Sequence, residues 1–192
     1  DHPEFRPNLS PAEVQQLGSF GGTYFRKIYS SATGQVHSNE HKEFPKEWFK
    51  GLAANQLTSS TYRPQLNKYG VKCGGSLDMW QSSGWINPTD PLGWYQWYCR
   101  FFLGRRTSDD ERQISRALKS MGPTGRFRCQ LINKCVSAGT TFDDYKISPV
   151  IRQSLQHWAY QLNQRDFDAY CKKKGYSVKK SQTSKKSKKS EL

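Results

Sequence analysis

The stretch "DPLGWYQWYCRFFLGRRTSDDER", residues 90–112, predicts the central element of the fold. Asp90 and Pro91 form a cap-plus-proline start that is typical of an α-helix, and Gly104 is a typical stop. Between them, aromatic residues recur at spacings of three and four, the stripe that a core helix buries: Trp94, Trp97, Tyr98, Phe101 and Phe102. We therefore expect an aromatic core helix, with Tyr95 as the ring most exposed to solvent.

Two further segments begin with a cap residue and a proline, and a third begins with a cap residue and acids. "SPAEVQQLG" offers Ser10 as the cap and ends at Gly18, and "SPVIRQSLQHWAYQLN" offers Ser148. In "SDDERQISRALKSMG", Ser108 is expected to cap the helix, and the three acids after it would meet the positive end of the helix dipole. "TGRFRCQLINKCVSAG" and "DFDAYCKKKG" predict two more helices, so the second half is expected to be all-helical.

The segment from Gly21 to Gly84 has weaker signals and is expected to be irregular. "GGTYFRKIYSSATGQ" favours a pair of strands or an extended arm, "EFPKEWFKGL" a short helix, and the Gly-rich "YGVKCGGSLDMWQSSGW" short strands and loops. The predicted fold is a single α+β domain, predominantly α-helical, over residues 1–171 and ordered from about residue 8. Residues 172–192 form a tail with almost no apolar content, which is expected to be disordered from about residue 176.

Charge favours a polyanionic partner. The chain of 192 residues carries a formal net charge of +14. Nine lysines lie between Lys172 and Lys189, and the chain up to Cys171 holds 21 basic and 15 acidic residues, a net charge of +6. Such a balance is typical of proteins that bind nucleic acid or an acidic surface, although a lysine tail can also serve only to keep a protein soluble.

Nucleic-acid binding is the function that the sequence favours. On the expected helix after Ser108, three cations share one side at positions i, i+4 and i+7, which would suit a row of phosphate contacts. The candidate nucleic-acid-binding residues are Arg105, Arg106, Arg112, Arg116, Lys119, Arg126, Arg128 and, as a ring that could stack on a base, Tyr95. The alternative is that Arg112 and Arg116 pair locally with Asp109 and Glu111.

A small enzyme is the second function to consider, although the chain carries no catalytic signature, phosphate loop or dinucleotide fingerprint. Its site would be a pocket for an anionic small molecule, lined by aromatic rings and arginines, with His157 or Asp78 as weak candidates for an acid or base. "KCGGSLDMWQSSGW" is the best place for a pocket wall, because Gly74 and Gly75 allow close approach of the backbone.

Metal and cofactor sites are not expected. The five cysteines form no Cys-x-x-Cys pair and are expected to be reduced thiols. His37 and His41 have the spacing of ligands on a helix, but turn-forming residues surround them. We therefore expect neither a metal nor a cofactor.

A protein-interaction module with a localising tail is the third function class. The tail resembles a bipartite nuclear localisation signal, which favours a nuclear protein, whereas its last four residues, "KSEL", resemble an endoplasmic-reticulum retention signal. No apolar run is long enough for a membrane span, and a chain that begins with Asp1 leaves open an earlier leader. The sequence does not predict the oligomeric state.

Overall fold

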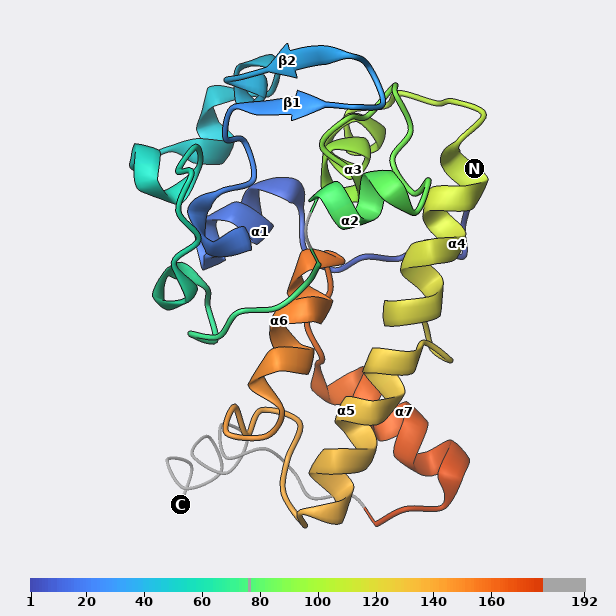
Figure 1. Ribbon diagram of the computed structural model, residues 1–192. Coiled ribbons are helices and arrows are strands. Elements are labelled where there is room, and N and C mark those ends of the chain that lie inside the picture. The colour runs from blue at the N-terminus through green and yellow to red at the C-terminus, as the bar shows by residue number, and fades with distance from the viewer. Residues whose placement is uncertain (76, 178–192) are drawn as a thin grey trace.

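The computed structural model describes residues 1–75 and 77–177, and it is predominantly helical with one two-stranded sheet (Figure 1). The α-helices are α1 (Pro11–Leu17), α2 (Leu77–Ser82), α3 (Trp94–Phe102), α4 (Asp110–Met121), α5 (Arg126–Ser137), α6 (Pro149–His157) and α7 (Gln164–Lys174). Short 3-10 helices span Phe20–Gly22, Glu40–Glu43, Lys46–Phe49, Ala54–Gln56 and Pro64–Leu66. The predictions of a mainly helical fold and of an all-helical second half are confirmed for the described residues.

The small sheet is the antiparallel pair of β1 (Ile28–Ser30) and β2 (Gln35–His37), in which Tyr29 lies opposite Val36. This confirms the strand pair expected in this segment. Figure 1 shows the β1–β2 hairpin at one end of the molecule, α5 and α7 at the opposite end, and α6 between them. Helix α5 packs against α4, α6 and α7, while α1 packs against α3.

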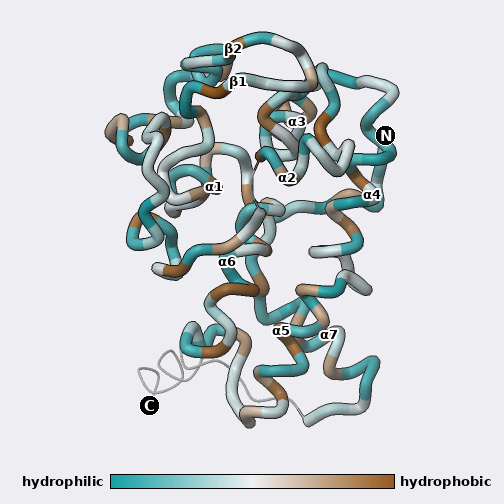
Figure 2. The backbone as a smooth tube through the Cα atoms, viewed as in Figure 1, coloured by the Kyte–Doolittle hydropathy of each residue, from teal (hydrophilic) through white to brown (hydrophobic). Residues whose placement is uncertain are grey.

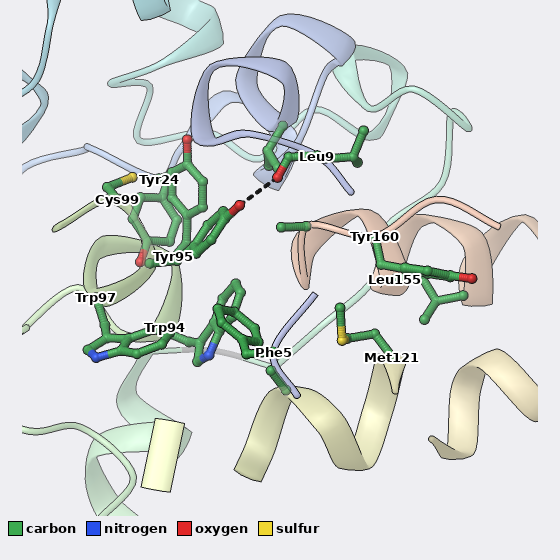
Figure 3. Close-up of a cluster of buried hydrophobic side chains, with 14 of the residues drawn as sticks. Phe5, Leu9, Tyr24, Trp94, Tyr95, Trp97, Cys99, Met121, Leu155 and Tyr160 are labelled. Carbon is green, nitrogen blue, oxygen red and sulfur yellow. Dashed lines mark hydrogen bonds between the residues drawn. The ribbon is translucent and has the colours of Figure 1, made fainter. Parts of the chain in front are cut away.

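Helix α3 lies at the centre of the hydrophobic core. Trp97 is fully buried, and Tyr95 and Tyr98 are nearly so. Figure 3 shows Trp94, Tyr95 and Trp97 in the cluster of buried hydrophobic side chains. The polar tips of these rings are satisfied, because the Tyr95 hydroxyl donates to the carbonyl of Pro11 and the Tyr98 hydroxyl donates to that of Leu9, both at 2.7 Å. The expected core helix is confirmed, but the expectation that Tyr95 is exposed is wrong: it is 2% exposed because α1 covers that side of α3.

The amphipathic helices around α3 follow the expected pattern. Along α4 and α5 the backbone alternates between hydrophilic and hydrophobic residues (Figure 2). On α4 the buried apolar residues are Ile114, Ala117 and Met121, and on α5 they are Leu131, Ile132 and Cys135. Burial of these faces holds the helical half together.

The expected helix caps are only partly correct. Ser10 accepts a hydrogen bond of 3.2 Å from the backbone N–H of Glu13, as predicted. Ser148 precedes α6 but has a left-handed backbone, with φ of 49°, and its side chain makes no capping bond. Ser108 lies before the cap position of α4, which Asp109 occupies. The prediction that Ser108 and Ser148 cap their helices is therefore wrong.

Asp90 also has a different role from the one expected. Helix α3 begins at Trp94, after Gly93 with φ of 104°, so Asp90 lies outside the helix. Its carboxylate is buried and binds two guanidinium groups, those of Arg100 at 2.9 Å and Arg105 at 2.7 Å. A buried carboxylate requires such partners, so Asp90 anchors the loops on either side of α3.

The Gly-rich segment forms a helix where short strands were expected. Residues Leu77–Ser82 are α2, with Leu77 buried in the core and Trp80 packed against it. A Cβ atom on Gly75 would lie 2.1 Å from the methyl carbon of Met79, the end of a flexible side chain that packs over this glycine. The predicted disorder of the tail concerns residues that lie mostly outside the described part of the chain.

Candidate functional site: an aromatic pocket with unpaired cations

A pocket of about 750 Å³ lies between α2, the start of α3, α6 and parts of the irregular segment over residues 20–75. Aromatic rings form much of its lining, among them Phe20, Tyr24, Tyr62, Trp80, Trp94 and Trp158. Gly74, Gly75, Trp80 and Trp85 belong to this lining, as the sequence suggested for a pocket wall. The volume is within the range of pockets that enclose small molecules.

The turn at "SFGGT", residues 19–23, shapes one wall of the pocket. Phe20, Gly21 and Gly22 have φ values of 58°, 58° and 82°, a left-handed run that is strained for the non-glycine Phe20. A Cβ atom on Gly21 would lie 2.5 Å from the Tyr62 ring, and one on Gly22 would lie 2.0 Å from the carbonyl oxygen of Asn55. Sequence analysis missed this turn, although the paired glycines were its signal.

His157, at the end of α6, is held by two hydrogen-bond donors on the same ring nitrogen. The backbone N–H of Phe20 donates to its Nε2 at 3.0 Å. The Gln153 amide nitrogen also lies 3.0 Å from Nε2, and the amide is oriented by the backbone N–H of Tyr69, which donates to Gln153 Oε1 at 3.1 Å. Because Nε2 accepts twice, the proton of the neutral ring lies on Nδ1.

The Nδ1 atom of His157 faces the thiol of Cys73 at 3.4 Å. Burial lowers the pKa of His157 to about 3 and raises the pKa of Cys73 to about 11, so both groups are neutral near pH 7. The pair is therefore not a thiolate–imidazolium pair. In this arrangement His157 can donate a hydrogen bond through Nδ1, but it offers no free nitrogen to act as a base.

Three cations of the pocket lining lie in no ion pair within the described part of the chain: Arg26, Lys72 and Arg116. Arg116 donates to the neutral Gln113 Oε1 at 2.8 Å, and its guanidinium lies 5.7 Å from the centre of the Trp158 ring. Burial and the neighbouring charge of Arg112 lower the pKa of Arg116. Asp109, which pairs with Arg112, opposes this lowering only in part, so the positive charge of Arg116 is partly desolvated and no carboxylate of the described residues lies in an ion pair with it.

Most of the arginines proposed from the sequence for phosphate contact are engaged elsewhere. Arg105 binds Asp90, and Arg112 holds both carboxylate oxygens of Asp109 at 2.6 and 2.9 Å. Arg128 lies 3.4 Å from a carboxylate oxygen of Asp166.

The remaining proposed cations do not form a single row. Arg106 pairs with Asp1 and stacks on Phe101. Lys119 and Arg126 are exposed, whereas Arg116 faces the pocket. The structure thus supports local pairing for Arg112 but not for Arg116.

The remaining chemical candidates lie apart from the pocket. Asp78 is an exposed residue of α2 that is not among the pocket-lining residues. His37 contacts Thr33 and Glu40. In the described ranges, no group of three or more His, Cys, Asp or Glu side chains could hold a metal ion, and no helix is long and apolar enough to cross a membrane.

Comparisons of the chain with protein-family models, with curated proteins and with solved structures give no significant match. The function is therefore inferred from the geometry and charge of the pocket.

Proposed function

We propose that this protein binds an anionic aromatic molecule, of the class of the nucleoside phosphates, in the aromatic pocket. The observation that carries the proposal is Arg116, a partly buried cation that lines the pocket and has no carboxylate partner in the described residues. Removing a charge from water without a counter-charge costs free energy, and a bound anion would offset that cost. Arg26 and Lys72 add positive charge to the same lining.

The aromatic lining supports a planar ring in the ligand. Trp80, Trp85 and Trp158 offer faces on which a base can stack, and stacking on aromatic side chains contributes about 1–3 kcal/mol per base. A ligand that combines a planar ring with a phosphate uses both features of the pocket. This is the second function class drawn from the sequence, an aromatic pocket for an anionic small molecule, and no reaction is assigned to it.

Calorimetric titration of the full chain tests the proposal, with the four 5′-monophosphates AMP, GMP, CMP and UMP and the corresponding nucleosides as probes. We expect saturable binding with one ligand per chain, and at least tenfold weaker binding of the nucleosides, equivalent to about 1.4 kcal/mol. Arg116→Gln should weaken binding of the phosphates about tenfold or more, because a hydrogen bond to a charged group contributes about 1.5–3 kcal/mol. Absence of saturable binding by all four phosphates at millimolar concentration would overturn the proposal.

Arg6→Gln is the matched control, since Arg6 is an exposed arginine that is not among the pocket-lining residues. It removes the same charge from the protein as Arg116→Gln does. Equal losses in the two variants would mean that net charge, rather than the pocket, attracts the anion.

Binding of nucleic acid to the surface is a second candidate, favoured by the exposure of Lys119 and Arg126, which lie in no ion pair among the described residues. The nine lysines from Lys172 onward add to it by charge alone. If each of the two side chains neutralises one phosphate, replacing both by Gln should reduce the slope of log affinity against log salt by about 1.8, measured on a duplex. An unchanged slope would remove Lys119 and Arg126 from the interface.

A further inference from the structure

We infer that His157 recognises a carbonyl oxygen on the ligand's ring through its Nδ1–H group, which makes the pocket selective for keto over amino nucleobases. This inference rests on the proposed function, because it names the ring chemistry of the same ligand. It adds a neutral recognition point to the cations that would hold the phosphate.

The hydrogen-bonding role of the His157 ring is fixed by its surroundings. Reversing the ring's tautomer would place a proton on Nε2, against the backbone N–H of Phe20 and the amide of Gln153. Gln153 cannot reverse its amide at no cost, because its Oε1 accepts from Tyr69 and its nitrogen donates to the Gly18 carbonyl at 3.1 Å. Two opposed donors make the Nε2–H form unfavourable.

Stacking and the adjacent turn also prevent the His157 ring from rotating to present another atom to the pocket. The Phe20 ring stacks on the imidazole, with centroids 4.1 Å apart and planes 20° from parallel. Phe20 is itself held in the left-handed turn, because the backbone N–H of the next residue, Gly21, donates to Asn67 Oδ1 at 2.8 Å. The strained turn thus fixes both a face and an edge of His157, which is the kind of rigid support that a recognition site requires.

The Nδ1–H donor of His157 has only a weak acceptor among the described residues. Within the described residues, the hydrogen-bond partner of Nδ1 is Cys73 Sγ at 3.4 Å, and a thiol sulfur is a weak acceptor. Both Cys73 and His157 belong to the pocket lining, and neither residue is fully buried. A carbonyl oxygen that entered beside Cys73 would be a stronger acceptor for the same N–H group, whereas an amino group would oppose it with a second donor.

The test compares pairs of nucleotides that differ at this one group: UMP with CMP, and IMP with AMP. Calorimetric titration of the full chain should give at least tenfold tighter binding for the keto member of one pair or both. Equal affinities within both pairs would overturn the role of His157 while leaving the proposed pocket intact. Failure of all four nucleotides to bind would instead overturn the proposed function, on which this inference rests.

Two variants of His157 connect the preference to the Nδ1–H group. His157→Phe keeps a planar ring but removes the donor, and it should abolish the preference. His157→Asn can place an amide N–H near the former Nδ1 position and should retain a measurable part of it. Preservation of the full preference in His157→Phe would overturn the inference.

A measurement on the unaltered protein covers the case in which these variants do not fold. In protein labelled with ¹⁵N on histidine, the Nδ1–H signal of His157 should shift more on saturation with the keto nucleotide of at least one pair than on saturation with its amino partner. Equal responses within both pairs would overturn the inference.

Discussion

The indole N–H of Trp97 donates a hydrogen bond of 2.8 Å to Oδ1 of Asp110, and both side chains are buried. The same carboxylate accepts from the backbone N–H of Thr107 at 2.9 Å and from the Thr107 hydroxyl at 3.2 Å. Asp110 thus joins the centre of α3 to the first turn of α4. Since α4 also carries Arg116, this contact positions the cation of the pocket.

Replacing Asp110 by Ala should therefore destabilise the protein by about 2–4 kcal/mol, because it leaves the buried indole N–H and the Thr107 donors without a partner. Urea unfolding followed by tryptophan fluorescence measures the change. Glu111→Ala removes the next acid of the same turn, which is exposed, and should cost less than about 0.5 kcal/mol. Similar losses in both variants would mean that the acids act through the helix dipole alone.

The observed caps give a second prediction. Ser10→Ala should lower the free energy of unfolding by about 1 kcal/mol, because Ser10 accepts from the Glu13 N–H. Ser108→Ala and Ser148→Ala should each change it by less than about 0.5 kcal/mol, since neither side chain caps a helix. A loss near 1 kcal/mol in either of these two would contradict the cap geometry described above.

A comparison of Gly21 with Gly34 separates two effects of a substitution by Ala, the steric clash at the pocket wall and the backbone strain. Their φ values are 58° and 68°, so Ala is strained at both positions. A Cβ atom meets the Tyr62 ring at Gly21 but nothing within 4 Å at Gly34. Gly21→Ala should therefore be more destabilising than Gly34→Ala by about 1–3 kcal/mol, measured by denaturant unfolding. Equal losses would mean that the Tyr62 ring moves aside freely.

Sequence reasoning succeeded where the signal lies between neighbours along the chain. The spacing of Trp94, Trp97 and Tyr98 predicted the core helix, and Ser10 predicted the start of α1. It failed where the burial of a residue depends on a segment that is distant in the sequence. Tyr95 lies off the aromatic stripe but is covered by α1, where it reaches the Pro11 carbonyl.

The candidate site shows the same division. Gly74, Gly75 and the tryptophans of "GGSLDMWQSSGW" indicated a pocket wall, and His157 was a candidate because of its residue type. The orientation of the Arg116 side chain could not be predicted. Acids of its own helix were possible partners, and the aromatic ring that it contacts comes from a distant segment. The structure places Arg116 beside Trp158 and leaves Asp109 to Arg112.

The low pKa of His157 predicts a pH dependence of stability. The folded protein keeps the imidazole neutral to about pH 3, whereas the unfolded chain protonates near pH 6.5. Below pH 6.5 the unfolded state therefore binds more protons, and stability falls by at most about 1.4 kcal/mol per pH unit from this residue. The groups that contact the ring do not oppose this, because the Cys73 thiol stays neutral and the Phe20 and Gln153 groups do not titrate.

Urea unfolding at pH 7, 6 and 5 measures this dependence, with His157→Phe as the comparison. The difference in stability between the two proteins should shrink or change sign as the pH falls, because only the unaltered chain has the imidazole to protonate on unfolding. A difference that is constant over this range would show that His157 has an ordinary pKa in the folded protein.

Cys73 provides a direct reporter of pocket occupancy. Of the five thiols, Cys99, Cys135 and Cys171 are buried, and only Cys73 and Cys129 are partly exposed. In the Cys129→Ser variant, iodoacetamide should therefore label Cys73 alone. The reaction at pH 8 should be slower than for a free thiol, because burial raises the pKa of Cys73 to about 11 and the thiolate is the reactive form. UMP at saturation should slow it further by covering Cys73, as mass spectrometry of the modified peptide would measure. Labelling at the same rate with and without saturating UMP would place the nucleotide outside this pocket.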